Sequence, residues 1–586
     1  MADGGVFGRV LVIDVTDGSS RVLEVPPEVT RDHLGGVGLG VWLMTELAPV
    51  GIDPLGPGAP LCFVFSPLVG TPLTTSAKFA VVAKSPLTGL LTDALASSHF
   101  AIAGKLTGHD AIVLVGRAAV ASVLLVEDGA VLLQPAGELW GLSAAQAEAA
   151  LREREGHRWQ VAAIGTAGER GVAYATISHD GRHAGRGGLG AVLGSKHLKA
   201  VAVRGTRKVA PADPAGVLAA AKDLRARSLG RATAKYRELG TMANVLALNA
   251  LSTLPTRNFR EASFEHAPAL GAEELAQARS VVRNSCASCS IGCEHLYATK
   301  GGGRVRMEHQ SVASLGSLCG VGDPEAVLVA SARCDELGID TISTGGTIAW
   351  AMECAERGLL DAPWLRFGDG AALLRAVQEI GSGEGLGPLL ALGSRAAARE
   401  LGQGSAFASQ VKGLELPAYD PRTMQTTALG LAVNARGADH NRSGAHDADL
   451  SGDLDRLRGG RAHVLAAVEA EDRAAVMDSM ILCSVLRKVF DDDPVPEWAR
   501  LLSLVTGWDL DATELRATAE RIVLAKRAYN LREGWTPADD WLPERFLTSG
   551  IALASGRTAT LTAERLRAMI NGYYAARGLD ASGRPA

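Results

Sequence analysis

The first two hundred residues carry short apolar runs separated by turn residues. Runs of β-branched and aromatic side chains occupy positions 9–15, 60–65, 79–83, 111–115 and 200–204, and Gly, Pro or Asp residues lie between them. Short apolar runs between turn signals are typical of buried strands. This part of the chain is therefore predicted to be rich in β-structure.

The pattern changes after the polar segment 205–208. From Pro214 onward, Ala, Leu and Arg recur with helical spacing, and helical patterns dominate to the end of the chain. Pro and Gly cluster again at 411–421, which indicates a second joint. We therefore predict an α+β fold, with a β-rich domain over 1–208 and two mainly helical domains over 209–412 and 413–586.

Composition narrows the class of protein. Hydrophobic residues make up 47% and charged residues 21% of the 586 residues, which is typical of a globular protein with a large core. A net charge of −5 gives no basic footprint for nucleic acid. No signal-peptide pattern opens the chain, and no run of about 18 apolar residues could span a membrane. We expect a cytoplasmic protein that binds neither nucleic acid nor a membrane.

Three of the eight cysteines, Cys286, Cys289 and Cys293, form a C-x2-C-x3-C pattern. One loop with this spacing can place three thiolates around an iron–sulfur cube, and the fourth ligand then comes from elsewhere. Structural zinc sites usually combine two close pairs, and no second C-x2-C is present. A [4Fe–4S] cluster is thus favoured over zinc or unmetallated thiols. Spacing alone leaves the fourth ligand open among Cys319, Cys334, Cys354 and Cys483.

Two glycine-dense stretches, 34–41 and 185–196, stand in the first domain. Glycine lets backbone amides approach a phosphate closely. Neither stretch has the order of a P-loop or a complete dinucleotide motif, and tight turns are the alternative interpretation. Arg182 and Arg186 flank the second stretch, and arginine can pair with phosphate or stack on a planar ring. An anionic ligand is therefore favoured there.

Several segments match one family in order: LGGVGLG (34–40), SPLVGTP (66–72), KSPLTG (84–89) and AGRGGLGAVLGSK (184–196). Together they resemble the aldehyde ferredoxin oxidoreductase family, the tungsten enzymes with a bis-pterin cofactor. The resemblance covers nearly the whole chain. It implies a first domain of two β-sheets that forms a base for the flat cofactor, with two mainly helical domains closing over it.

The resemblance also implies cofactor-binding residues. Cys483, in the motif DSMILC (478–483), would join the three clustered cysteines as the fourth cluster ligand, and DELGID (335–340) resembles the partner motif. In the family each motif binds one pterin, and a carboxylate can accept hydrogen bonds from two N–H groups at a pterin edge. The residues implied in cofactor binding are Lys78, Arg182, Gly185, Arg186, Gly187, Asp335, Gly338, Asp340, Asp478 and Leu482.

Departures from the family lie near the expected metal. The family's YE motif aligns with His309-Gln310, and glutamine cannot act as a general base. Glu308 lies two residues before Gln310, a spacing that does not fix its side chain in the same direction. His440 matches the family's active-site histidine and suits proton transfer. Four residues around the cofactor also differ from the family. Val37 and Lys78 each replace an arginine, and Ile481 replaces a glycine. Leu95 replaces an asparagine that lies near a magnesium ion between the pterin phosphates.

These observations support a leading hypothesis and two alternatives. The first is a tungsten- or molybdenum-pterin oxidoreductase with one [4Fe–4S] cluster, a ferredoxin-like electron partner and a small-molecule substrate other than simple aldehydes. The second is a non-oxidative enzyme on the same scaffold, and the third is a partner subunit that has lost catalysis. A homodimer and a bound Mg²⁺ ion are expected on the resemblance alone.

Overall fold

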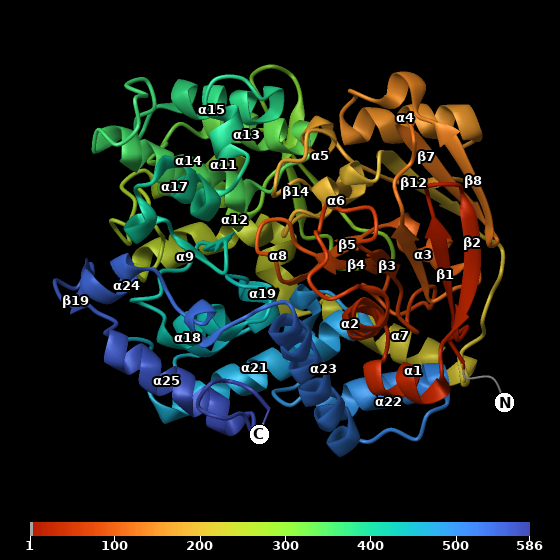
Figure 1. The fold of residues 1–586 in the computed structure, drawn as a ribbon. Helices are drawn as coiled ribbons and strands as arrows, with labels where there is room; N and C mark the ends of the chain where they lie inside the picture. The colour runs from red at the N-terminus through yellow and green to blue at the C-terminus, as the bar shows by residue number, and fades with distance from the viewer. Residues whose placement is uncertain (1–3, 586) are drawn as a thin grey trace.

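The computed structural model describes residues 4–585. Two six-stranded sheets form the first part of the chain, in red to orange on the right of Figure 1, with the orders β2-β1-β6-β3-β4-β5 and β11-β10-β9-β12-β7-β8. Neighbouring strands run antiparallel except β1 beside β6 and β7 beside β12. The strands are β1 (Arg9–Asp14), β2 (Ser19–Glu24), β3 (Leu61–Val64), β4 (Lys78–Lys84), β5 (Leu91–Ser97), β6 (Ala111–Val115), β7 (Ser122–Glu127), β8 (Ala130–Pro135), β9 (Gln160–Ala163), β10 (Ile177–His179), β11 (Arg182–Ala184) and β12 (Leu198–Arg204).

Strand β4 shows why these segments are continuous apolar runs. Phe79 and Val81 pack into a core that both sheets share. Ala80 and Val82 belong to a second core, on the opposite face, together with residues of helix α2 (Gly36–Leu47). Because both faces are buried, the strand needs no polar side.

The glycine-dense stretch 34–41 forms the beginning of α2, not a phosphate loop or a separate tight turn. A Cβ atom at Gly40 would lie 2.4 Å from the side chain of Val82, and one at Gly36 would lie 2.6 Å from the carbonyl oxygen of Asp478. Glycine therefore lets this helix approach both the sheet and a distant segment closely.

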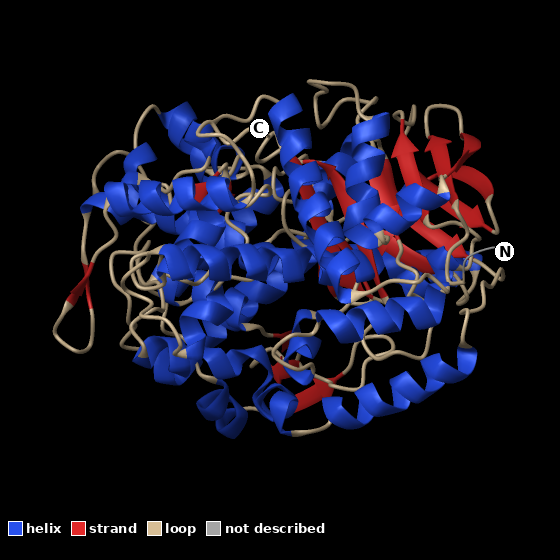
Figure 2. Ribbon diagram, turned by 90° about the horizontal axis from the view of Figure 1, so that it is seen from below, coloured by secondary structure: helices blue, strands red, loops and turns tan. Residues whose placement is uncertain are grey.

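Helices dominate from Pro214 onward (Figure 2), and the predicted α+β fold class is confirmed. A small sheet of β13 (Val281–Asn284), β14 (Glu294–Ala298) and β15 (Arg304–Arg306) interrupts them. The principal helices are α7 (Pro214–Ser228), α9 (Asn244–Ala250), α12 (His309–Leu315), α13 (Pro324–Leu337), α14 (Thr341–Glu356), α15 (Gly370–Ser382), α17 (Ser394–Leu401), α18 (Gln425–Val433), α21 (Arg461–Met480), α22 (Val495–Thr506), α23 (Ala512–Arg532) and α25 (Ala563–Ala576).

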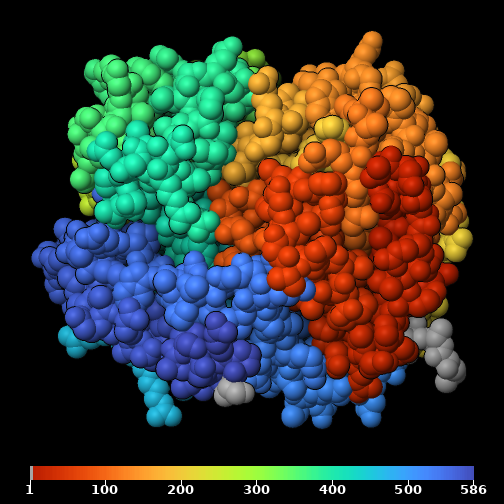
Figure 3. Space-filling model, viewed as in Figure 1, coloured from red at the N-terminus to blue at the C-terminus, as the bar shows by residue number. Residues whose placement is uncertain are grey.

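The early, middle and late parts of the chain pack against one another on the face shown in Figure 3. One large apolar core contains residues from both helical regions, for example Val312 and Leu566. The predicted boundary at 412/413 falls within a short hairpin of β16 (Gln410–Val411) and β17 (Leu414–Glu415). Among the described residues, no helix has the length and apolar character needed to cross a bilayer.

Candidate functional site

The loop between β13 and β14 carries Cys286, Cys289 and Cys293, and Cys483 follows helix α21. Thr75 connects the two segments: its amide donates to the carbonyl of Ser288 at 2.7 Å, and its hydroxyl accepts from the amide of Cys483 at 3.3 Å. The structure therefore brings Cys483 beside the three-cysteine loop, although nearly two hundred residues separate them.

The cysteines of this loop and Cys483 lie close enough to shift one another's pKa values. Burial raises the pKa values of Cys286, Cys289 and Cys293, and negative charge on the other thiols, Cys483 included, raises them further. A cationic metal core would instead stabilise the thiolates. The other candidates for the fourth ligand, Cys319, Cys334 and Cys354, lie in the large apolar core.

The geometry does not suit a single zinc ion. Two sulfurs on one zinc lie at most about 4.6 Å apart, because each Zn–S bond is about 2.3 Å. Among the described residues, the one trio of potential ligands with all ligand atoms within 4.8 Å of one another contains no cysteine. In the part of the chain that the structure describes, no three cysteine sulfurs are gathered at the spacing of a single zinc ion.

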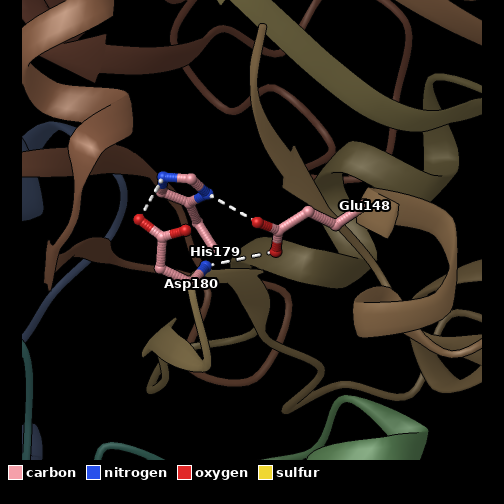
Figure 4. Close-up of side chains that lie close together, drawn as sticks. All are labelled: Glu148, His179 and Asp180. Carbon is pink, nitrogen blue, oxygen red and sulfur yellow. Dashed lines mark hydrogen bonds and ion pairs between the residues drawn. The ribbon is translucent and has the colours of Figure 1, made fainter. Parts of the chain in front are cut away.

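That trio is Glu148, His179 and Asp180, shown in Figure 4. Glu148 approaches Nδ1 of His179 at 3.5 Å, whereas Asp180 approaches Nε2 at 3.1 Å. Arg152 pairs with both carboxylates. The imidazole thus lies between the two carboxylates, and the group is an ion-pair cluster of the first domain rather than a metal site.

The first Asp motif spans the junction of α13 and α14. Asp335 pairs with His183 at 3.1 Å. Gly338 ends α13 in the left-handed conformation, with φ of +76°. Asp340 caps α14 by accepting from two backbone amides, and it pairs with Arg186 at 3.2 Å. The motif therefore fixes both a helix start and an arginine that comes from the second glycine stretch.

The second Asp motif ends helix α21. Asp478 pairs with Arg442 at 3.0 Å, and burial raises its pKa to about 6. Ile481 caps the helix with φ of +61°. A β-branched residue in this conformation stores about 1–3 kcal/mol of strain, so the replacement of the family's glycine by isoleucine has an energetic cost. Leu482 is buried in an apolar core beside the cysteine loop.

Buried ion pairs lie between the two motifs. Arg442 contacts both Asp478 and Asp93, and Asp439 pairs with Arg436 at 2.8 Å and with Arg186 at 3.8 Å. Sequence reasoning singled out Arg186 and Asp478 but not Asp93, Arg436, Asp439 or Arg442. The only signal for Arg436 and Asp439 was the segment RGADH (436–440), in which both precede His440.

The remaining cofactor candidates lie between these features. Arg182 pairs with Glu294 at 2.9 Å, and the negative charge of Cys286 helps to raise its pKa against the effect of burial. Burial raises the pKa values of both Cys286 and Asp478, and the positive charge of Lys78 partly offsets this rise. Lys78 therefore lies near both residues. At Gly187 a Cβ would meet Thr92 at 2.0 Å, whereas Gly185 has room for one. Leu95 packs in an apolar core.

Three histidines and a tyrosine form a buried ring cluster. The ring of Tyr419 lies 6.1 Å from His309, 5.5 Å from His440 and 5.2 Å from His446. Burial lowers the pKa values of His309 and His446 to about 4 and that of His440 well below its usual value. All three imidazoles are therefore neutral at pH 7. Neither Tyr419 nor His446 carried a motif signal.

Gln310 borders this cluster, and Glu308 does not. The Gln310 side-chain oxygen accepts from the amide of Ala418 at 2.9 Å. Glu308 pairs instead with Arg306 at 3.1 Å and Arg182 at 3.6 Å, on the side of the cysteine loop. The sequence left the direction of the Glu308 side chain open, and the structure places its carboxylate with the arginines.

Unpaired polar atoms mark the same region. Nε2 of Gln310, Nδ1 of His440, Oγ1 of Thr92 and two nitrogens of Arg436 are buried without a hydrogen-bond partner. Native proteins pair nearly all such atoms. A polar, multidentate ligand that contacts the first domain, both Asp motifs and the histidines therefore fits this part of the protein.

Two sheets joined to helical domains, with a three-cysteine loop and Cys483 beside buried ion pairs, point to an enzyme that holds a ligand between its domains. Family comparison agrees: residues 10–205 match the aldehyde ferredoxin oxidoreductase N-terminal domain, and residues 219–586 match domains 2 and 3 of that enzyme. The chain belongs to the aldehyde ferredoxin oxidoreductase family, and it is an oxidoreductase of that family.

Curated relatives span the whole chain. The tungsten-containing aldehyde ferredoxin oxidoreductase of Pyrococcus furiosus is 34% identical over 596 residues, which cover 99% of this chain and 97% of that protein. The aliphatic sulfonate oxidoreductase WOR-like subunit of the same organism is 27% identical and covers 99% of this chain and 95% of that protein. The BamBC active-site complex of benzoyl coenzyme A reductase superposes with a TM-score of 0.84 at 22% identity, covering 100% of this chain and 96% of that chain, which shows a shared fold.

Proposed function

We propose that this protein is a tungsten- or molybdenum-bis-pterin oxidoreductase whose one [4Fe–4S] cluster is bound by Cys286, Cys289, Cys293 and Cys483. The observation that carries the proposal is the Thr75 bridge, which holds Cys483 against the cysteine loop. The names of the tungsten-containing relatives support the choice of metal.

The chain's residues suit separate cofactor roles. Asp335, Asp340 and Asp478 offer carboxylates to the pterin edges, and Gly187 gives close access to the first domain. Lys78 lies near both a cluster cysteine and Asp478, a suitable position between the cluster and one pterin. When bound, the metal-pterin group supplies two-electron chemistry.

Proton handling falls to the histidine cluster. His440 is neutral and has an unpaired Nδ1, so it can accept a hydrogen bond from a substrate; its lowered pKa makes it a weak base. His309 and Tyr419 shape the same chamber. Gln310 can donate or accept a hydrogen bond but cannot take up a proton, so a substrate that needs a carboxylate base at this position is a poor one. We therefore propose a substrate other than a simple aldehyde.

Two features favour a second candidate, a non-oxidative metal-pterin enzyme or a catalytically inactive partner subunit. Gln310 lacks acid–base chemistry, and Leu95 lies in an apolar core with no oxygen to offer a magnesium ion. If Mg²⁺ binds the pterin phosphates, its ligands come from other groups. These losses are local, whereas all four cysteines and both Asp motifs are kept, and the redox proposal remains the stronger one.

We also propose a ferredoxin-like electron carrier, a small-molecule substrate, a cytoplasmic location and assembly as a homodimer. The four cluster cysteines are partly exposed, which suits electron exchange with an external protein.

Metal and pterin analysis of anaerobically purified protein tests the proposal. The expected result is about four iron atoms and one tungsten or molybdenum atom per chain, with pterin released on denaturation. Protein that contains iron but neither tungsten nor molybdenum would exclude the metal-pterin part of the proposal. Substrate turnover with bound metal but without reduction of a dye would favour the non-oxidative candidate.

A further inference from the structure

One buried arginine near the proposed cofactor site keeps a free edge. Arg436 lies between α18 and the short helix α19 (His440–Ser443) and is only 5% exposed. Its Nη1 pairs with Asp439 at 2.8 Å. Its Nε and Nη2 have no hydrogen-bond partner in the described part of the chain.

The two free nitrogens form a defined recognition unit. In a guanidinium group, Nε–H and Nη2–H point to the same side, and together they match two oxygens of a phosphate or carboxylate. A buried cationic edge without a partner is costly, since each unmade charged hydrogen bond costs more than a neutral one. The arrangement therefore suits a bidentate oxyanion.

The neighbouring arginines are occupied by protein groups. Arg186 bonds Asp340 and two backbone carbonyls, those of Ala438 and Glu415. Arg442 spans Asp93 and Asp478. Arg436 is thus the member of this group whose fork is open.

The location connects the fork to the reactive region. Asp439, which pairs with Arg436, also caps α19 by accepting from the amides of Asn441 and Arg442. That helix begins with His440. An anion on Arg436 would therefore lie between the ion pairs of the Asp motifs and the histidine cluster.

We propose that the Nε–Nη2 edge of Arg436 is an oxyanion-binding site that receives either a phosphate group of the bound cofactor or the anionic group of a substrate. The first source rests on the proposed function, and the second does not. Bidentate pairing makes lysine a poor replacement, because its ammonium group keeps the charge but loses the fork.

The test compares wild-type holoenzyme with Arg436→Lys. Two quantities are measured: the rate at which pterin is lost during incubation in mild denaturant, and the binding of inorganic phosphate by calorimetry. Arg545→Lys is the matched control, since Arg545 is a largely buried arginine that pairs with Glu353. The thermal midpoints of all three proteins are also measured. They show whether a change in pterin loss or phosphate binding is larger than the change in overall stability explains.

Each source has its own signature. If the cofactor phosphate occupies the fork, Arg436→Lys loses pterin about 10- to 100-fold faster than wild type and Arg545→Lys does not. If a substrate anion occupies it, pterin loss is unchanged, while wild type binds phosphate about 10- to 100-fold more tightly than Arg436→Lys. Unchanged pterin loss together with phosphate binding that does not depend on Arg436 would overturn the proposal.

These outcomes are separable from a failure of the proposed function. Wild-type protein that contains no pterin and no tungsten or molybdenum would exclude the proposed cofactor. Phosphate binding to that same protein, compared with Arg436→Lys, would still decide whether the fork recognises an oxyanion.

Discussion

Replacing Gln310 with glutamate should restore a base at the position where the chain departs from its family. The side-chain oxygen of Gln310 accepts from the amide of Ala418, and its Nε2 is buried without a partner. Glutamate has the same shape, so one carboxylate oxygen keeps the Ala418 bond. The other oxygen would lie beside Tyr419, whose hydroxyl interacts with the Gln310 side chain, and near the neutral imidazoles.

The expected gain in rate and loss of stability in Gln310→Glu follow from the surroundings of this side chain. Burial raises the pKa of the new carboxyl above its ordinary value near 4.3, which strengthens it as a base. A positioned general base contributes about 10²- to 10⁴-fold in rate, or about 3–5 kcal/mol of barrier. The buried second oxygen costs about 1–3 kcal/mol of stability, which the large core can tolerate.

Dye-coupled oxidation of acetaldehyde by anaerobically purified protein measures the effect. Gln310→Glu should exceed wild type by about 10²- to 10⁴-fold, and its rate should rise with pH as the carboxyl ionises. Gln310→Ala is the control, because it opens space without adding a base. Equal rates for Gln310→Glu and Gln310→Ala at equal metal content would refute the assigned role of this position.

Two further predictions concern buried charge. Burial opposes ionisation of His179, but the hydrogen bonds that its ring donates to Asp180 and Glu148 outweigh burial and raise the pKa. The stabilisation from this charge is therefore complete below about pH 6.5 and is lost as the pH rises through the raised pKa. At low pH, wild type should have a higher thermal midpoint than His179→Gln, and the difference between the two midpoints should narrow as the pH increases. A difference that does not change with pH would contradict the ion-pair interpretation. Arg442→Met leaves Asp93 and Asp478 buried without their shared partner and should lower the free energy of unfolding by about 3–5 kcal/mol. The variant should therefore unfold at a lower denaturant midpoint. A midpoint equal to that of wild type would show that Arg442 does not neutralise the two carboxylates.

The sequence predicted those parts of the fold that depend on local pattern. The β4 segment is apolar on both faces, so its run indicated a buried strand directly. The Asp340 helix cap is also local, because the carboxylate accepts from amides two and three residues ahead, but the sequence was interpreted there as a cofactor motif and not as a helix start. Family motifs pointed to Cys483, which spacing alone could not distinguish from Cys319.

Other features depend on contacts that no local pattern encodes. Asp93 and Arg442 are 349 positions apart and meet only in the folded chain. Tyr419 and His446 join the histidine cluster from separate segments and carry no motif. The glycines of 34–41 resembled a phosphate loop because sequence cannot tell close helix packing from ligand access; only the position of Val82 decides between them.

The cluster assignment is tested most directly by the iron content of Cys483→Ala beside Cys319→Ala. Both replacements remove one thiol, but Cys319 lies in the apolar core and Cys483 lies beside the cysteine loop. The expected result is a loss of iron and of the visible absorbance in Cys483→Ala alone. Full iron content and unchanged absorbance in Cys483→Ala would contradict the assignment.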